Sequence, residues 1–191
     1  MTLTDRFADA LTYTCALHAE QRRKASDVPY ISHLLGVASL AIEHGADEDE
    51  SIAALLHDAV EDQGGAEQLE AIRARFGARV ATIVDGCTDA YVLPKPPWRE
   101  RKEQHLEELV EADASIRLVV GCDKLHNARA LVRDYVELGE ALWQRFRGGR
   151  DGTLWYYRAV ADLLARDASP LSRELEREVS RMEQLAANAR R

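Results

Sequence analysis

Apolar residues recur every three or four positions along almost the whole chain, which is the spacing of an amphipathic α-helix. No segment alternates apolar and polar residues convincingly enough to indicate a strand. The sequence therefore predicts an all-α fold, a single bundle of about ten helices. We expect these helices, the first of them capped by Thr4, over residues 7–16, 31–44, 48–61, 67–76, 80–89, 98–111, 115–135, 138–146, 153–166 and from 170 onward.

Glycine and proline mark the expected ends of these helices. Gly45 and Gly77 each follow a helical segment, where glycine is the usual C-terminal cap, and Gly64–Gly65 ends another. The proline-rich segment 91–97 is interpreted as a loop inside one domain, either a lid or an ordinary connection. The segment 148–152 is interpreted as a turn between two helices.

Two helices differ from the rest in how their apolar residues are distributed. The helix over 48–61 is apolar almost all round, which places it in the middle of the core. The last helix carries one apolar stripe, and we divide the chain into a domain of residues 1–168 and a C-terminal amphipathic helix of 169–191. This stripe could dock on the chain's own core or on a second subunit, which leaves a homodimer open. The stripe consists of Leu171, Leu175, Val179, Met182 and Leu185.

Composition narrows the class of protein. Of 191 residues, 46% are hydrophobic and 30% charged, which excludes a disordered or collagen-like chain. The 25 Lys and Arg residues against 33 Asp and Glu give a net charge of −8, so the chain lacks the cationic surplus of a general nucleic-acid binder. An anionic substrate must therefore be held by local cations or by a metal ion.

The cysteines and the apolar runs indicate the compartment. Three cysteines without a Cys-x-x-Cys spacing predict reduced thiols rather than a disulfide framework. The N-terminus has no apolar stretch behind a basic start, and the longest apolar run, 34–42, is far shorter than the roughly 20 residues of a membrane span. We expect a soluble, cytoplasmic protein with no membrane partner.

The helix over 48–61 contains the first candidate site. His57 and Asp58 follow each other inside this most apolar segment, and burying either group without a partner is costly. A divalent metal ion is the simplest compensating ligand. Glu61 and Asp62 lie one turn further along and could orient or deprotonate a water molecule, or could be the solvated end of the helix. Both interpretations of Glu61 and Asp62 stay open from the sequence.

His33 and Asp123 extend the candidate metal site. His33 alone would read as a capping or core histidine, whereas Asp123 follows the apolar run 116–122, where a carboxylate is as costly as Asp58. Asn127 lies one turn beyond Asp123 on the same face. Two imidazoles and two carboxylates suit Mn²⁺, Fe²⁺ or Zn²⁺, and ligand type alone does not choose among them.

These motifs resemble a known family. Tyr30-Ile31-Ser32-His33, the run from Ala53 to Asp62, and the run from Asp123 to Arg129 are similar to the hydrolase domain of RelA/SpoT homologues, a group of HD-domain phosphohydrolases. Among these, the chain looks most like the stand-alone small alarmone hydrolases, including the animal SpoT-like type. The resemblance spans roughly Phe7 to Leu164. Its most specific part is the Leu-Leu-His-Asp motif that ends at Asp58, followed by Glu61 and Asp62.

The resemblance implies a Mn²⁺-dependent hydrolase that removes the 3′-pyrophosphate of guanosine tetra- or pentaphosphate. The positions matching the family's metal ligands are His33, His57, Asp58 and Asp123. Those matching its water-activating acidic pair are Glu61 and Asp62. Those matching substrate contacts are Arg23, Lys24, Asn127 and, on a loose alignment, Tyr156. Without the resemblance, Arg23 and Lys24 are interpreted as the solvated end of a helix, and Tyr156 as an aromatic residue of the core.

Two departures from the family pattern bear on the substrate. The stretch 119–123 lacks the lysine that the family often shows before the aspartate, and the linker between Lys24 and His33 is a residue shorter than in the most similar stand-alone enzymes. One alternative is therefore hydrolysis of another nucleotide, such as the 2′-phosphate of NADPH or a nucleoside 5′-phosphate. Another is a nucleotide-binding module without turnover, against which the acidic pair argues.

Overall fold

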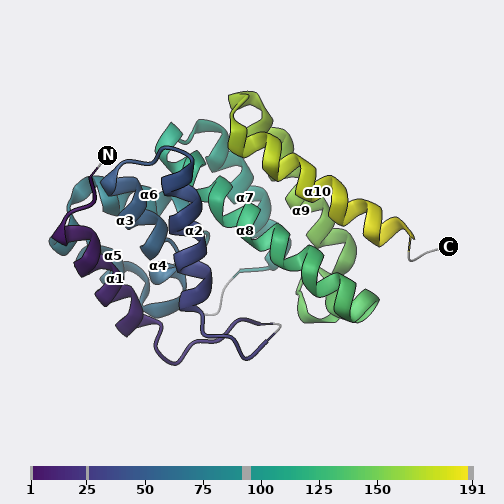
Figure 1. Ribbon diagram of the computed structural model, residues 1–191, viewed down its shortest axis with the longest axis horizontal. Coiled ribbons are helices and arrows are strands. Elements are labelled where there is room, and N and C mark those ends of the chain that lie inside the picture. The colour runs from purple at the N-terminus through teal and green to yellow at the C-terminus, as the bar shows by residue number, and fades with distance from the viewer. Residues whose placement is uncertain (1, 25, 92–95, 189–191) are drawn as a thin grey trace.

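The computed structural model describes residues 2–24, 26–91 and 96–188, and these form an all-α bundle (Figure 1). Within this part of the chain the only β-type pairing is an isolated bridge between Arg22 and Pro29, so the predicted all-α class is confirmed. The helices are α1 (Asp5–Leu17), α2 (Ile31–Glu43), α3 (Glu48–Leu56), α4 (Ala59–Gln63), α5 (Gly65–Phe76), α6 (Ala78–Cys87), α7 (Trp98–Glu111), α8 (Ala114–Leu138), α9 (Gly149–Leu164) and α10 (Pro170–Asn188), with 3₁₀ segments over Gly139–Arg145 and Ala165–Asp167.

Local signals set several helix ends. The side chains of Thr4, Asp47 and Asp113 each accept a hydrogen bond from a backbone N–H in the first turn of α1, α3 and α8. Gly45 and Gly77 follow α2 and α5 with φ of 90° and 97°, a conformation that favours glycine. The expected Thr4 cap and the two expected glycine ends are confirmed.

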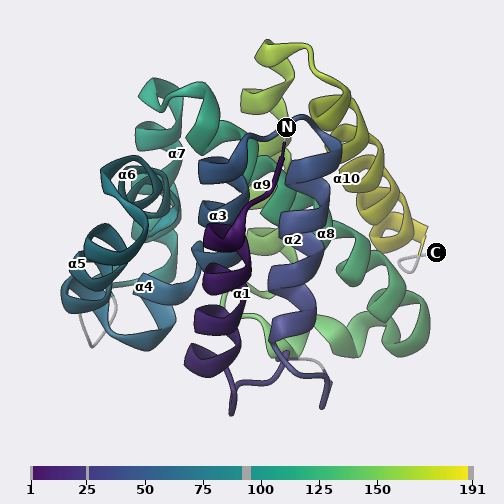
Figure 2. The same cartoon turned by 60° about the vertical axis from the view of Figure 1, so that its left-hand side comes forward.

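Helix α3 lies in the middle of the bundle, as its apolar sequence predicts. Every residue from Ser51 to Leu56 is buried. The helix packs against α1, α2, α6 and α8, and Figure 2 shows it behind α1, between α6 and α2. A side chain at the end of α3 is therefore enclosed by several helices at once.

Helix α8 links the two ends of the bundle. Its first half, including Val119 and Leu125, belongs to the main core with α2, α3 and α6. Its second half forms a smaller cluster in which Leu131 and Tyr135 meet Met182 of α10. The apolar stripe of α10 thus docks on this chain's own helices, while the division of the chain at residue 168 stays a prediction. Among the described residues, no helix is long and apolar enough to cross a bilayer.

The expected single helix over 48–61 is wrong, because α3 ends at Leu56 and α4 begins at Ala59. The His57 side chain explains the break. Its Nδ1 donates to the Ala54 carbonyl at 2.9 Å, and a continuous helix would offer that carbonyl to the Asp58 N–H. At this interruption the His57 side chain is buried and the Asp58 side chain is largely covered.

Two other expectations need correction. The predicted turn over 148–152 is mostly helical, because α9 begins at Gly149. Cβ atoms at Gly148 and Gly152 would lie 2.6 and 3.0 Å from the Trp98 ring, so these glycines make room for that ring rather than forming a turn. The segment expected as a helix over 138–146 is mainly 3₁₀. Residues 92–95 of the predicted loop lie outside the described residues.

Candidate metal centre and active site

Four predicted residues from three parts of the chain converge on one point. His33 lies in the first turn of α2, His57 and Asp58 lie between α3 and α4, and Asp123 lies within α8. The Nε2 atoms of His33 and His57 are 3.6 and 3.1 Å from Asp58 Oδ2, and 3.2 and 3.7 Å from Asp123 Oδ1. His33, His57 and Asp123 are buried, and Asp58 is largely covered.

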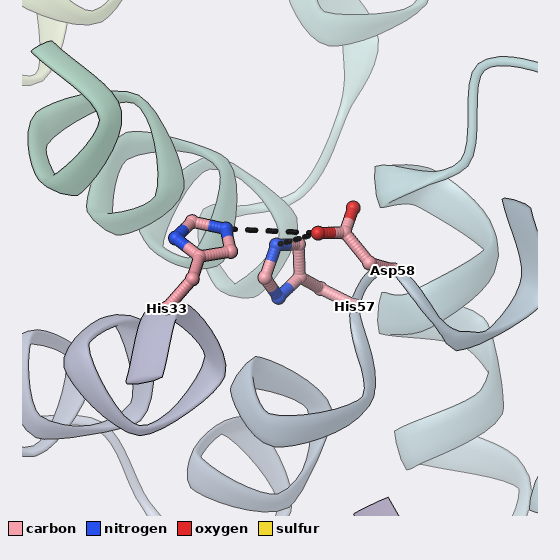
Figure 3. Close-up of side chains that lie close together, drawn as sticks. All are labelled: His33, His57 and Asp58. Carbon is pink, nitrogen blue, oxygen red and sulfur yellow. Dashed lines mark ion pairs between the residues drawn. The ribbon is translucent and has the colours of Figure 1, made fainter. Parts of the chain in front are cut away.

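The two imidazole rings are held so that one nitrogen of each faces the carboxylates, as Figure 3 shows for Asp58. His57 Nδ1 donates to the Ala54 carbonyl, and His33 Nδ1 is 2.9 Å from His126 Nδ1. Both Nε2 atoms are buried and have no hydrogen-bond partner among the described residues. A ring that donates from Nδ1 keeps its lone pair on Nε2, which is the form that binds a metal.

This donor set fits a divalent metal ion. His33, His57 and Asp58 each offer one ligand atom, and those atoms lie within 4.8 Å of one another. Asp123 adds a second carboxylate at similar range. Nitrogen and oxygen donors without thiolate, around two otherwise unsatisfied buried nitrogens, match a divalent ion with coordination positions left for water.

Electrostatics keep the carboxylates ionised. Burial opposes charge on Asp58, yet the neighbouring His57 and His33 hold its pKa well below the usual range. Burial likewise opposes charge on Asp123, while Lys124 and the two histidines lower its pKa strongly. For His57, burial is outweighed by the two carboxylates, which raise its pKa well above 6.5. A bound cation would take the place of the proton that this cluster attracts.

Hydrogen bonds from neighbouring side chains fix the carboxylates. The Tyr30 hydroxyl donates to Asp58 Oδ2 at 2.5 Å, and burial next to Asp58 raises the pKa of this phenol far above 10, so it stays protonated as a donor. Asn127 Nδ2 donates to Asp123 Oδ1 at 2.5 Å, and Lys124 Nζ donates to Asp123 Oδ2 at 2.6 Å. The sequence analysis did not predict these roles of Tyr30 and Lys124. The signal available was their position close to candidate ligands, Tyr30 shortly before His33 and Lys124 directly after Asp123.

Glu61 and Asp62 point to different surroundings. Glu61 is half-buried and lines a small cavity together with His57, Asp58 and Asp123. The cavity measures about 30 Å³, room for about one or two water molecules. Asp62 is exposed and accepts a hydrogen bond from Gln21 Nε2 at 2.8 Å. Of the acidic pair, Glu61 is therefore the carboxylate beside the candidate metal centre.

The far wall of this cavity is a charged cluster that sequence reasoning missed. Asp89 is buried and pairs with Arg101 and Lys102 of α7. Burial opposes its ionisation, but Lys102, a hydrogen bond with Glu61 and the Arg101 charge together lower its pKa to about 2. His105 lies on the same wall, and burial with nearby lysines lowers its pKa to about 4, so this ring is neutral. Helix α7 thus has a buried face formed by Arg101, His105 and Leu109. The four-residue spacing of these positions is the signal in the sequence that could have indicated it.

The predicted substrate contacts lie in three different environments. Arg23 Nη2 donates to Asn127 Oδ1 at 2.8 Å, which places both beside the Asp123 carboxylate. Lys24 is exposed on the loop next to Arg23. Tyr156 is buried in the main core, with the Lys102 and Lys124 ammonium groups 4.8 and 5.5 Å from its ring centroid.

An all-α bundle whose centre joins a histidine, a His-Asp doublet and a later aspartate defines the class of HD-domain proteins. The profile of the HD domain matches residues 10–154 of this chain. The chain belongs to the HD-domain family.

Comparison with individual members of the family identifies a narrower group of similar proteins. The guanosine-3′,5′-bis(diphosphate) 3′-pyrophosphohydrolases MESH1 of Xenopus tropicalis and Homo sapiens are 39% and 37% identical to it over 128 residues, which is 65% of this chain and 69% of each relative. A solved structure described as a metazoan ortholog of SpoT that hydrolyzes ppGpp superposes with a TM-score of 0.79 at 30% identity. That superposition covers 97% of this chain and 99% of the other. These similarities confirm the resemblance to the RelA/SpoT hydrolases.

Proposed function

We propose that this chain is a divalent-metal-dependent hydrolase that removes the 3′-pyrophosphate of guanosine tetra- or pentaphosphate and yields GDP or GTP. The observation that carries the proposal is the convergence of His33, His57, Asp58 and Asp123, with both buried Nε2 atoms turned toward the two carboxylates. The relatives named as 3′-pyrophosphohydrolases support this substrate class.

The four converging residues would hold the ion, which when bound supplies a water of lowered pKa and polarises a phosphoryl oxygen. Mn²⁺ is the proposed metal, because the donors are nitrogen and oxygen without thiolate and the resemblance implies it. Fe²⁺ and Zn²⁺ are the alternatives that a metal comparison would test.

Glu61 is the proposed general base. It lines the cavity beside His57 and Asp58, where it could accept a proton from water. Attack of that water on the phosphorus attached to O3′ breaks the P–O3′ bond and releases pyrophosphate. The departing O3′ takes up the proton that Glu61 accepted, or one from solvent, and becomes a 3′-hydroxyl. Asp62 accepts a hydrogen bond from Gln21 on the exposed side, which would hold α4 in place and thereby orient Glu61.

Local cations would offset the charge of the substrate, because the chain as a whole carries −8. Arg23, beside Asn127, and the exposed Lys24 are the proposed phosphate contacts, and Asn127 is the proposed contact to the ribose. Tyr156 is also a proposed substrate contact; its ring is buried, and the Lys102 and Lys124 ammonium groups, which lie over it, line the cavity. The cytoplasmic location and the homodimer stay predictions, to be tested by cell fractionation and sedimentation.

The test is hydrolysis by purified protein. Wild type with Mn²⁺ should release pyrophosphate and GDP from guanosine tetraphosphate, and His57→Ala or Asp58→Ala should release neither. The same assay with NADPH and nucleoside 5′-phosphates tests the other-substrate alternative. If metal-loaded protein bound guanosine tetraphosphate but formed no product with any metal, the proposed hydrolysis would be wrong and the binding-module alternative would stand.

A further inference from the structure

His126 lies on α8, three residues after Asp123, and reaches across to α2. Its Nδ1 is 2.9 Å from Nδ1 of His33, and the two ring centroids are 4.8 Å apart. The opposite nitrogen of His33, Nε2, faces Asp58 (Figure 3) and lies 3.2 Å from Asp123 Oδ1. His126 is therefore the group that contacts the nitrogen of His33 turned away from the candidate metal centre.

Gly36 provides an independent sign that the position of this ring matters. A Cβ at residue 36 would lie 2.3 Å from His126 Nε2 and 2.4 Å from its Cδ2. Gly36 sits inside α2 without a positive φ, so the backbone itself does not require glycine. A glycine inside a helix costs about 1 kcal/mol relative to alanine. The space it leaves is filled by the His126 ring.

We propose that His126 is a positioning residue for the metal centre: its Nδ1 accepts a hydrogen bond from His33 Nδ1–H and so keeps the His33 lone pair on Nε2. The opposite direction of donation would place the hydrogen of His33 on Nε2, where it would block metal binding. His57 has the same arrangement, with the Ala54 carbonyl as its acceptor. The inference rests on the metal site proposed above and is independent of which nucleotide is the substrate.

Three substitutions of His126 separate its hydrogen bond from its shape. His126→Phe keeps a ring over Gly36 and removes the acceptor, His126→Asn keeps an acceptor close to the Nδ1 position and loses the ring, and His126→Ala loses both. Calorimetric titration of Mn²⁺ into metal-free protein measures the affinity directly. We expect His126→Phe and His126→Ala to weaken binding by about ten- to a hundredfold, the usual effect of removing such a partner, and His126→Asn to recover most of it.

Gly36 supplies a second, independent comparison. Gly36→Ala should displace the His126 ring and weaken Mn²⁺ binding in the wild-type background. In the His126→Ala background the added methyl group meets no ring, so Gly36→Ala should leave Mn²⁺ affinity unchanged and raise the melting temperature of the metal-free protein. Circular dichroism of the metal-free variants checks the fold; if His126→Phe does not fold, the comparison of Asn with Ala carries the same information.

The outcomes distinguish this inference from the proposed function. Absence of divalent-ion binding by folded wild type would overturn the metal site and the inference with it. Wild-type affinity in both His126→Phe and His126→Ala would overturn the inference alone. So would a His126→Asn variant that binds Mn²⁺ no better than His126→Phe, or equal losses from Gly36→Ala in both backgrounds.

Discussion

Asp89 allows the electrostatics of the cavity wall to be tested by a single substitution. Its carboxylate is 3% exposed and pairs with Arg101, whose side chain is 7% exposed, and with Lys102, at 17%. Asp89→Asn keeps the shape of the side chain and removes its charge. Arg101 and Lys102 then lose the carboxylate that they share, and Arg101 keeps only its longer ion pair with Glu61, at 3.9 Å. Leaving buried charges without a close partner is the main cost of breaking a buried ion pair.

The expected loss can be worked out in two ways. Lowering the Asp89 pKa from 3.8 to about 2 corresponds to roughly 2 kcal/mol, because each pKa unit is worth about 1.4 kcal/mol. Removing one partner of a fully buried pair costs about 3–5 kcal/mol, and the partial exposure of Lys102 favours the lower end. We therefore expect Asp89→Asn to reduce the free energy of unfolding by about 2–4 kcal/mol at pH 7.

Urea unfolding followed by circular dichroism measures this loss. Glu103→Gln is the matched control, because Glu103 pairs with Arg99 on the same helix at 2.7 Å with both side chains about half exposed. Such an exposed pair contributes only about 0.3–0.5 kcal/mol. Because the pKa of Asp89 is lowered by folding, its contribution is complete above the unfolded pKa of 3.8 and is lost as pH falls toward about 2. A loss below about 1 kcal/mol, or one equal to the control, would show that Asp89 does not hold a stabilising buried ion pair.

Three further predictions concern the acidic pair, the metal and α10. Glu61→Gln should lower kcat by about 10²- to 10⁴-fold with unchanged Mn²⁺ affinity, measured by steady-state kinetics and titration calorimetry; an unchanged kcat would exclude it as the base. Removal of metal by EDTA should abolish turnover and lower the melting temperature, since an ion at a thousandfold its Kd stabilises by about 4 kcal/mol, and added Mn²⁺ should restore both. Arg158 of α9 donates to Glu176 and Glu183 of α10, and Arg158→Ala should destabilise the fold by about 1 kcal/mol in urea without changing KM.

The elements that follow from the sequence depend on local interactions. Thr4 caps α1 with its own hydroxyl, and Gly77 closes α5 with a positive φ, so both ends can be read from neighbouring residues. The apolar pattern from Ile52 to Leu56 identifies the central helix for the same reason, because burial on every side leaves no polar stripe.

The features that the sequence concealed depend on tertiary contacts. At the break after Leu56, the His57 side chain donates a hydrogen bond to the Ala54 carbonyl. The pattern of residue types along the chain does not indicate this contact. The buried face of α7 is hidden by its charge, because the ions on it are neutralised by Asp89 from another segment. The converging ligands could be proposed from residue type and resemblance, but the distances that bring His33 to Asp123 come only from the packing of α2 on α8.

Anomalous scattering from a crystal grown with Mn²⁺ and measured at the manganese absorption edge would locate the bound ion. We expect one strong peak per chain, within bonding distance of His33 Nε2, His57 Nε2, Asp58 and Asp123. A fully ordered site without a peak, or a peak that lies elsewhere on the chain, would contradict the proposed metal site.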